Sequence, residues 1–116
     1  MGGSRPPFAA SASPSDPPPN PVLVGSVWLP AFSRLYLAFD PPIVDGDIDD
    51  LTPWVYQMPD GDLPPLQITI TPSSMQFELD PAGGGEPYLV DYVPGVTPYV
   101  TAAGGVLQEL HHSLPV

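Results

Sequence analysis

Apolar and polar residues alternate with a period of two along most of the chain after residue 21. In residues 34–39, for example, Leu35, Leu37 and Phe39 fall on one face. This alternation is typical of a β-strand with one buried face. It predicts seven strands, at residues 22–29, 34–39, 54–58, 67–71, 75–79, 88–93 and 106–110, with residues 96–101 as a candidate extra edge piece.

Turn-forming residues separate these strand candidates. Prolines lie at the ends of the apolar runs, as at Pro30, where a sheet tolerates them. Residues 71–75 form a tight link in which Pro72 suits the first central position of a turn, whereas residues 80–87 form a longer loop. Short strands joined in this way predict an all-β fold, an antiparallel β-sandwich of about seven strands.

The first 21 residues have a different composition from the rest of the chain. They are rich in Pro, Ser, Ala and Gly and too poor in apolar residues to form a core. The prolines at 6–7 and 17–19 favour an extended polyproline II conformation. The expected organisation is an extended Pro-rich N-terminal arm at residues 1–21 and a sandwich domain at 22–116. The arm either binds another molecule or is a tail with no binding role.

The N-terminal residues do not have the pattern of a secretory signal, because residues 6–13 are too short and too polar for its apolar region. No run approaches the roughly 20 apolar residues that span a bilayer. We therefore expect a product that is made and kept in the cytoplasm until something else carries it.

The charge of the chain and its lack of cysteine restrict which partners and which metal sites are possible. The chain has 13 acidic residues, Arg5 and Arg34 as its only basic ones, and a net charge of −11. This charge argues against nucleic acid and against an anionic membrane, since both attract Lys and Arg. It serves either solubility or docking onto a basic protein surface. The absence of cysteine excludes disulfides and thiolate metal sites.

Two segments resemble a known family. Residues 35–43, Leu-Tyr-Leu-Ala-Phe-Asp-Pro-Pro-Ile, resemble the second strand of bacterial and phage immunoglobulin-like or fibronectin-like modules. Residues 90–95 and 102–108 resemble their closing hairpin. The resemblance implies an immunoglobulin-like sandwich. It also implies a role in adhesion, spacing or virion decoration, and no enzymatic activity.

An acidic segment is the sharpest candidate for local chemistry. Asp45, Asp47 and Asp49 alternate in a loop and could converge on a hard cation such as Ca²⁺. The EF-hand pattern fails here, because Asp50 stands where a glycine is needed. The alternative is a solvated acidic loop. His111 and His112 are neighbours on one candidate strand end and point to opposite faces, so they cannot ligate one metal together.

No pattern in the sequence predicts an enzyme or a bound cofactor. Its serines lack the surrounding residues of a nucleophile elbow, and both histidines lie near the C-terminus. The remaining candidates for a binding site are the aromatic residues. Most aromatics fill the core of a sandwich, but Tyr36 and Tyr56, if outward on adjacent strands, would form a patch for a sugar ring or a protein.

These observations favour a non-enzymatic structural protein of a bacteriophage virion, such as a capsid decoration, cement or head–tail accessory protein. The expected partners are capsid or tail subunits, with a homo-oligomer also open. The expected contact residues in and next to the arm are Arg5, Phe8, Val22, Leu23 and Val24. The alternative is an adhesion or carbohydrate-binding module of the same fold in a surface or tail assembly.

Overall fold

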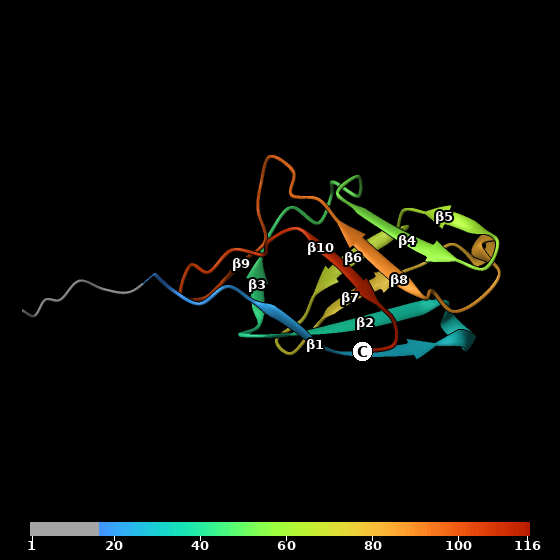
Figure 1. Cartoon of the computed structure of the whole chain (residues 1–116), viewed down its shortest axis with the longest axis horizontal. Coiled ribbons are helices and arrows are strands. Elements are labelled where there is room, and N and C mark those ends of the chain that lie inside the picture. The colour runs from blue at the N-terminus through green and yellow to red at the C-terminus, as the bar shows by residue number, and fades with distance from the viewer. Residues whose placement is uncertain (1–16) are drawn as a thin grey trace, which may run out of the picture.

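The computed structural model of the protein describes residues 17–116. Their fold is all-β, with two four-stranded antiparallel sheets and a two-stranded pair (Figure 1). The first sheet has the strand order β1 (Val22–Leu29), β2 (Arg34–Asp40), β7 (Met75–Glu78), β6 (Gln67–Ile70). The second has the order β10 (Leu110–Ser113), β8 (Leu89–Tyr92), β4 (Trp54–Met58), β5 (Gly61–Leu63). The pair consists of β3 (Ile43–Asp45) and β9 (Val100–Thr101).

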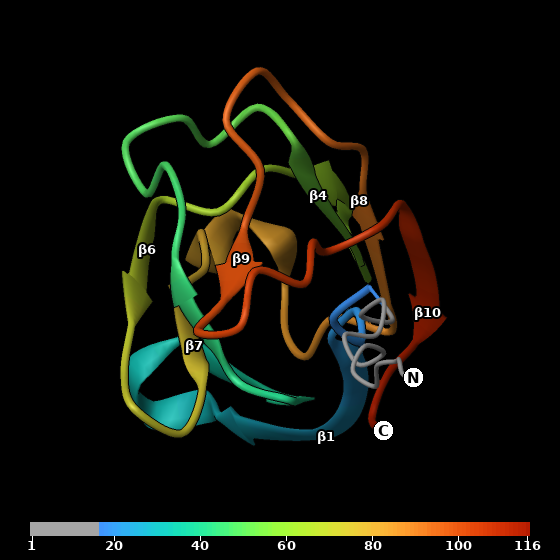
Figure 2. The ribbon, with the colours of Figure 1, turned by 90° about the vertical axis from the view of Figure 1, so that its left-hand side faces the viewer.

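The two large sheets lie on opposite sides of one core, and β9 lies across the end that faces the viewer in Figure 2. Alternation in the sequence places the core residues: Leu35, Leu37 and Phe39 of β2 are buried, and the residues between them are half-buried. This sandwich-like architecture follows from burying one face of each sheet against the other.

Aromatic rings join the two sheets across the core. Trp54 on β4 contacts Phe77 on β7 of the opposite sheet, with ring centroids 4.7 Å apart. It also contacts Tyr92 of its own sheet at 4.5 Å and Tyr99 at 5.6 Å. All four side chains are buried. Trp54 therefore lies at the centre of the packing that holds the sheets together.

Two of the connections are tight and are specified by local hydrogen bonds. Between β6 and β7, the Ser74 N–H donates to the Thr71 hydroxyl oxygen at 3.1 Å, and the Thr71 N–H donates to the Ser74 carbonyl at 2.8 Å. Between β1 and β2, the short 3₁₀ helix η2 (Pro30–Phe32) ends at Ser33 with φ of 50°. A second such helix, η3 (Pro81–Gly83), starts the loop before β8.

The last predicted strand is wrong. Residues 106–110 do not form a strand; Val106 makes only an isolated bridge with Val100, and the strand that pairs with β8 is β10, beginning at Leu110. The predicted edge piece at 96–101 is reduced to β9. Strands β3 and β5 have only three residues each, too few for a recognisable alternation, and the sequence pattern missed them.

Residues 17–21 contact the folded domain and form what we call the root of the N-terminal segment. Pro21 is buried, and the side-chain oxygen of Asn20 accepts a hydrogen bond from the Val106 N–H at 3.1 Å. A Cβ on Gly105 would collide with the carbonyl of Pro19, so the glycine permits this close approach. In the described part of the chain, no helix has the length and apolar character needed to cross a membrane.

Candidate binding surfaces

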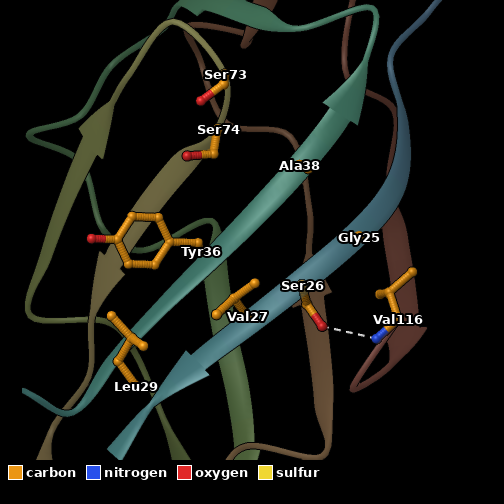
Figure 3. Close-up of a pocket in the computed structure, with 9 residues that line it drawn as sticks. All are labelled: Gly25, Ser26, Val27, Leu29, Tyr36, Ala38, Ser73, Ser74 and Val116. Atoms are coloured by element: carbon orange, nitrogen blue, oxygen red, sulfur yellow. Dashed lines mark hydrogen bonds between the residues drawn. The ribbon is translucent and has the colours of Figure 1, made fainter. Parts of the chain in front are cut away.

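A groove of about 500 Å³ lies on the outer face of the first sheet (Figure 3). We call it the β1–β2 groove. Its apolar lining comes from Val27, Leu29, Tyr36, Ala38 and Val116. Because these side chains point away from the core, the groove is open to a ligand or partner.

The pairing of β1 with β2 explains the groove. Gly25 lies opposite Ala38, and Val27 lies opposite Tyr36. Two very small residues side by side leave a depression beside a valine that is 56% exposed. A Cβ on Gly25 would lie 3.7 Å from the Ala38 Cβ, an ordinary contact, so the depression has room for more atoms. Along one side, the Val116 N–H donates to the Ser26 hydroxyl at 2.8 Å.

The structure separates the partner-binding residues expected from the sequence. Val22 and Val24 are exposed at the start of β1, but Leu23 between them is only 6% exposed and packs in the core. Successive side chains of a strand point to opposite faces, so Leu23 cannot join its neighbours in an outer contact. Arg5 and Phe8 lie outside the described residues.

The expected patch of Tyr36 and Tyr56 does not exist. Tyr36 lies in the β1–β2 groove, but Tyr56 belongs to β4 of the other sheet and is 0% exposed. Tyr56 shares its strand face with Trp54 and Met58, which are also buried. Burial, with a smaller effect from the nearby Tyr99, raises the pKa of the Tyr56 phenol well above its ordinary value.

We expect Tyr56 and Tyr99 to respond differently to loss of their hydroxyl groups. Within the described residues, the Tyr56 hydroxyl has no hydrogen-bond partner, whereas the Tyr99 hydroxyl donates to the Asp47 carbonyl at 2.8 Å. We expect Tyr99→Phe to lower the free energy of unfolding by about 1 kcal/mol, and Tyr56→Phe to leave it unchanged or raise it by up to about 1 kcal/mol. Urea unfolding of both variants measures this, and the reverse order would contradict it.

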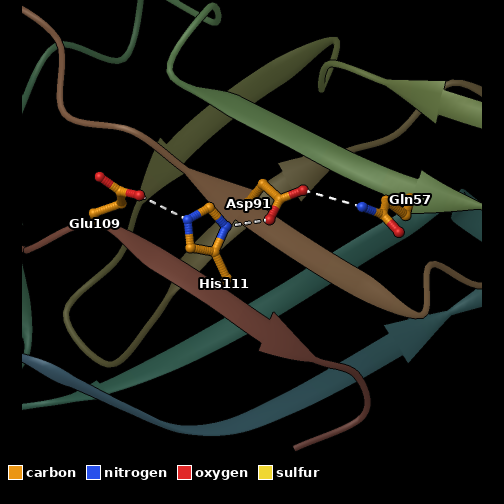
Figure 4. A network of polar contacts seen from close by, with 4 residues as sticks. All are labelled: Gln57, Asp91, Glu109 and His111. Carbon is orange, nitrogen blue, oxygen red and sulfur yellow. Dashed lines mark hydrogen bonds and ion pairs between the residues drawn. The ribbon is translucent and has the colours of Figure 1, made fainter.

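A polar network of four side chains lies on the outer face of the second sheet (Figure 4). His111 on β10 and Asp91 on β8 are cross-strand partners, and the His111 ring Nδ1 contacts the Asp91 carboxylate. The other ring nitrogen lies 2.7 Å from a Glu109 carboxylate oxygen. The Gln57 amide donates to Asp91 from the opposite side at 3.2 Å. The hydrogen bond to Asp91, followed by that to Glu109, raises the pKa of His111.

This network predicts a pH dependence. The pKa of His111 is raised in the folded state, so its stabilising contribution is fully present below the pKa of the unfolded histidine and is lost as the pH rises through the folded-state value. Asp91→Asn should lower the pKa of His111, measured from its ring signals by NMR, and should flatten the pH dependence of stability above the pKa of the unfolded histidine. A pKa unchanged by that substitution would show that the contact does not form in solution.

The acidic segment folds as a loop in which aspartate carboxylates accept hydrogen bonds from neighbouring backbone N–H groups. The Asp47 carboxylate accepts from the backbone N–H groups of Asp49 and Asp50, at 3.0 and 3.3 Å, and the Asp45 carboxylate accepts from the Gly46 N–H. Asp45, Asp47 and Asp49 are not grouped as ligands of one cation. Throughout residues 17–116, no three His, Cys, Asp or Glu side chains are grouped so as to hold a metal ion.

A second hollow, of about 440 Å³, lies at the β1–β2 turn and is lined by Trp28, Phe32 and Pro81 among others. We call it the Trp28–Phe32 hollow. Phe32 is 63% exposed, and the Arg34 guanidinium carbon lies 5.7 Å from the centre of its ring. Arg34 makes no ion pair with a carboxylate among the described residues.

The sequence reasoning missed both hollows. Each is assembled from separate parts of the chain, since the β1–β2 groove also takes Ser73, Ser74 and Val116 and the Trp28–Phe32 hollow takes Pro81 and Gly85. One local signal was present, the small residues Gly25 and Ala38 in two neighbouring apolar strands.

Comparison with known proteins finds no matching family model, no matching curated protein and no matching solved structure.

Proposed function

We propose that the domain is an immunoglobulin-like sandwich. The support is the order of its strands. In immunoglobulin domains, named A to G along the chain, one sheet has the order A-B-E-D and the other contains C, F and G with an added C′ strand. If the short β3 and β9 are set aside, β1-β2-β7-β6 corresponds to A-B-E-D and β10-β8-β4-β5 to G-F-C-C′.

Trp54 supports the same assignment. In this correspondence it lies on strand C, where immunoglobulin domains carry a buried tryptophan that packs on an inter-sheet disulfide. This chain has no cysteine, and Trp54 packs instead on the rings of Phe77 and Tyr92. Aromatic packing takes over the role of the disulfide, which suits a protein that folds without oxidation.

We further propose that the protein is a non-enzymatic structural component of a bacteriophage virion, a capsid decoration, cement or head–tail accessory protein. The observation that carries this proposal is the root at residues 17–21. It is fastened to the domain by Asn20 and Pro21, whereas Pro17, Pro18 and Pro19 are exposed. A segment anchored at its base on a rigid domain suits binding to a neighbouring subunit, because the domain fixes where the segment begins.

Charge supports a protein partner. All acidic residues except Asp16 lie in residues 17–116, where Arg34 is the only Lys or Arg. This surface repels phosphate backbones and anionic lipids and suits basic patches on protein subunits. The −11 net charge also keeps free copies soluble before assembly.

Immunogold labelling of purified particles tests the proposal. With an antibody against the domain, we expect gold at regular positions on the head or at the head–tail junction of phage particles from the source culture. An antigen that is found only free in the lysate, with particles unlabelled, would overturn the proposal.

The Trp28–Phe32 hollow favours a second function, carbohydrate binding by an adhesion module. An exposed aromatic ring can stack on a sugar ring, and an arginine beside it can donate hydrogen bonds to the sugar's hydroxyl groups. This alternative predicts binding of the full chain to a glycan array, and loss of that binding in Phe32→Ala. A chain that binds no glycan on the array would exclude it.

A further inference from the structure

The β1–β2 groove has the features of a site for an extended peptide. It is apolar, contains Tyr36, and runs beside β1, the outermost strand of its sheet. Proline-rich segments bind grooves of this kind, because polyproline II chains are already extended and lose little entropy on binding. The exposed Val27 would be covered by such a ligand.

The chain itself carries a segment with the matching chemistry. Residues 5–8 are Arg-Pro-Pro-Phe, with prolines for an extended backbone and a phenylalanine for an apolar depression. Arg5 is the only Lys or Arg in residues 1–16, and the body that would receive it is strongly acidic. The attraction between Arg5 and this acidic body favours docking on a copy of the same chain, while the uncharged lining of the groove suits Pro6, Pro7 and Phe8.

The geometry of the root favours a second copy as the receiver. Residues 17–21 extend away from the sheets at the end where β3 and β9 lie, whereas β1 runs from Pro21 in the other direction toward the groove (Figure 1). Three consecutive prolines at 17–19 are stiff, so a return of Phe8 to the groove of its own copy requires the chain to reverse its direction between Phe8 and Pro17. A neighbouring copy beyond that end requires none.

We propose that residues 1–16 of one copy bind in the β1–β2 groove of the next copy. This inference rests on the proposed role of the N-terminal segment and specifies its receiver. The contact is head-to-tail, joining two different surfaces, so repetition produces a ring or an open row of copies along a larger particle.

Photo-crosslinking of the full chain tests the proposal. Phe8 is replaced by benzoylphenylalanine, and ¹⁴N-labelled and ¹⁵N-labelled copies are mixed before irradiation. We expect cross-linked peptides that join residue 8 of one isotope to β1 or β2 of the other. Cross-links within one isotope only would place the segment in its own groove and overturn the proposal, as would cross-links to other faces or none.

A matched pair of valine variants gives a second readout. Val27 in the groove and Val44 on β3 are both exposed strand valines, 56% and 50% exposed. Val27→Ser should raise the dissociation constant of self-association, measured by sedimentation velocity, about tenfold, and Val44→Ser should leave it unchanged. Equal effects, or no self-association of the full chain, would overturn the inference.

The same reagents separate this inference from the proposed function. If particles contain the protein with residue 8 cross-linked to a different virion subunit, the structural role stands and the groove is not the receiver. If the protein is absent from particles but copies cross-link through the groove, the receiver is correct and the virion role fails.

Discussion

Trp54→Ala should lower the free energy of unfolding by about 3–5 kcal/mol, the largest effect we expect from one substitution. The side chain is fully buried and contacts Phe77, Tyr92 and Tyr99, so its loss leaves a cavity between the sheets. Core truncations of this kind lose both the transfer free energy and the contacts around the cavity. Urea unfolding followed by circular dichroism measures the change.

Trp28→Ala is the matched control, because it removes the same side chain from a half-buried position at the Trp28–Phe32 hollow. We expect a cost of at most about 1–2 kcal/mol, since part of this ring already contacts water in the folded state. Equal costs for the two tryptophans would contradict the packing that places Trp54 at the centre of the core.

Removal of residues 1–21 should destabilise the domain, and removal of residues 1–16 should not. The longer deletion removes the buried Pro21 and the hydrogen bond between Asn20 and Val106, with an expected cost of about 2–3 kcal/mol. The shorter deletion leaves the root in place, and we expect a change within about 0.5 kcal/mol.

Thermal and urea unfolding of the two truncated chains measure this difference. The difference between the two truncations shows at which residue the folded domain begins. The change of composition near residue 21 does not show this. If both truncations leave stability unchanged, the root is not part of the folded unit, and the anchored-segment argument loses its support.

Strands that alternate and are buried on one face could be predicted from the sequence. β1 and β4 have the predicted bounds, and β2, β6, β7 and β8 differ from theirs by only a residue at one or both ends. These strands pack against the opposite sheet, so the hydrophobic pattern is a direct consequence of their environment.

The edge strand β10 of the second sheet could not be predicted in the same way. β10 contains His111 and His112 and lies at the edge of its sheet, so burial leaves little apolar pattern there. Val106 and Leu107 are apolar for a different reason, since Leu107 is buried and its N–H donates to the Tyr99 carbonyl. A local pattern cannot distinguish a buried loop residue from a strand residue.

The candidate site was predictable only in part. Alternate residues of β4 point to the same face, so Tyr56 lies on the face of Trp54 and Met58. Its burial could therefore have been inferred from the sequence. The β1–β2 groove could not, because Ser73 and Val116 reach it from distant parts of the chain. Such a surface depends on tertiary packing rather than on any local motif.

Competition between two forms of the chain during particle assembly tests the account most directly. An equimolar mixture of tagged full-length protein and tagged residues 17–116 is supplied to assembling particles, which are then purified on a density gradient. The account predicts that the purified particles are strongly enriched in the full-length protein over the truncated form, although both are folded. Incorporation of both forms in the ratio supplied would contradict it.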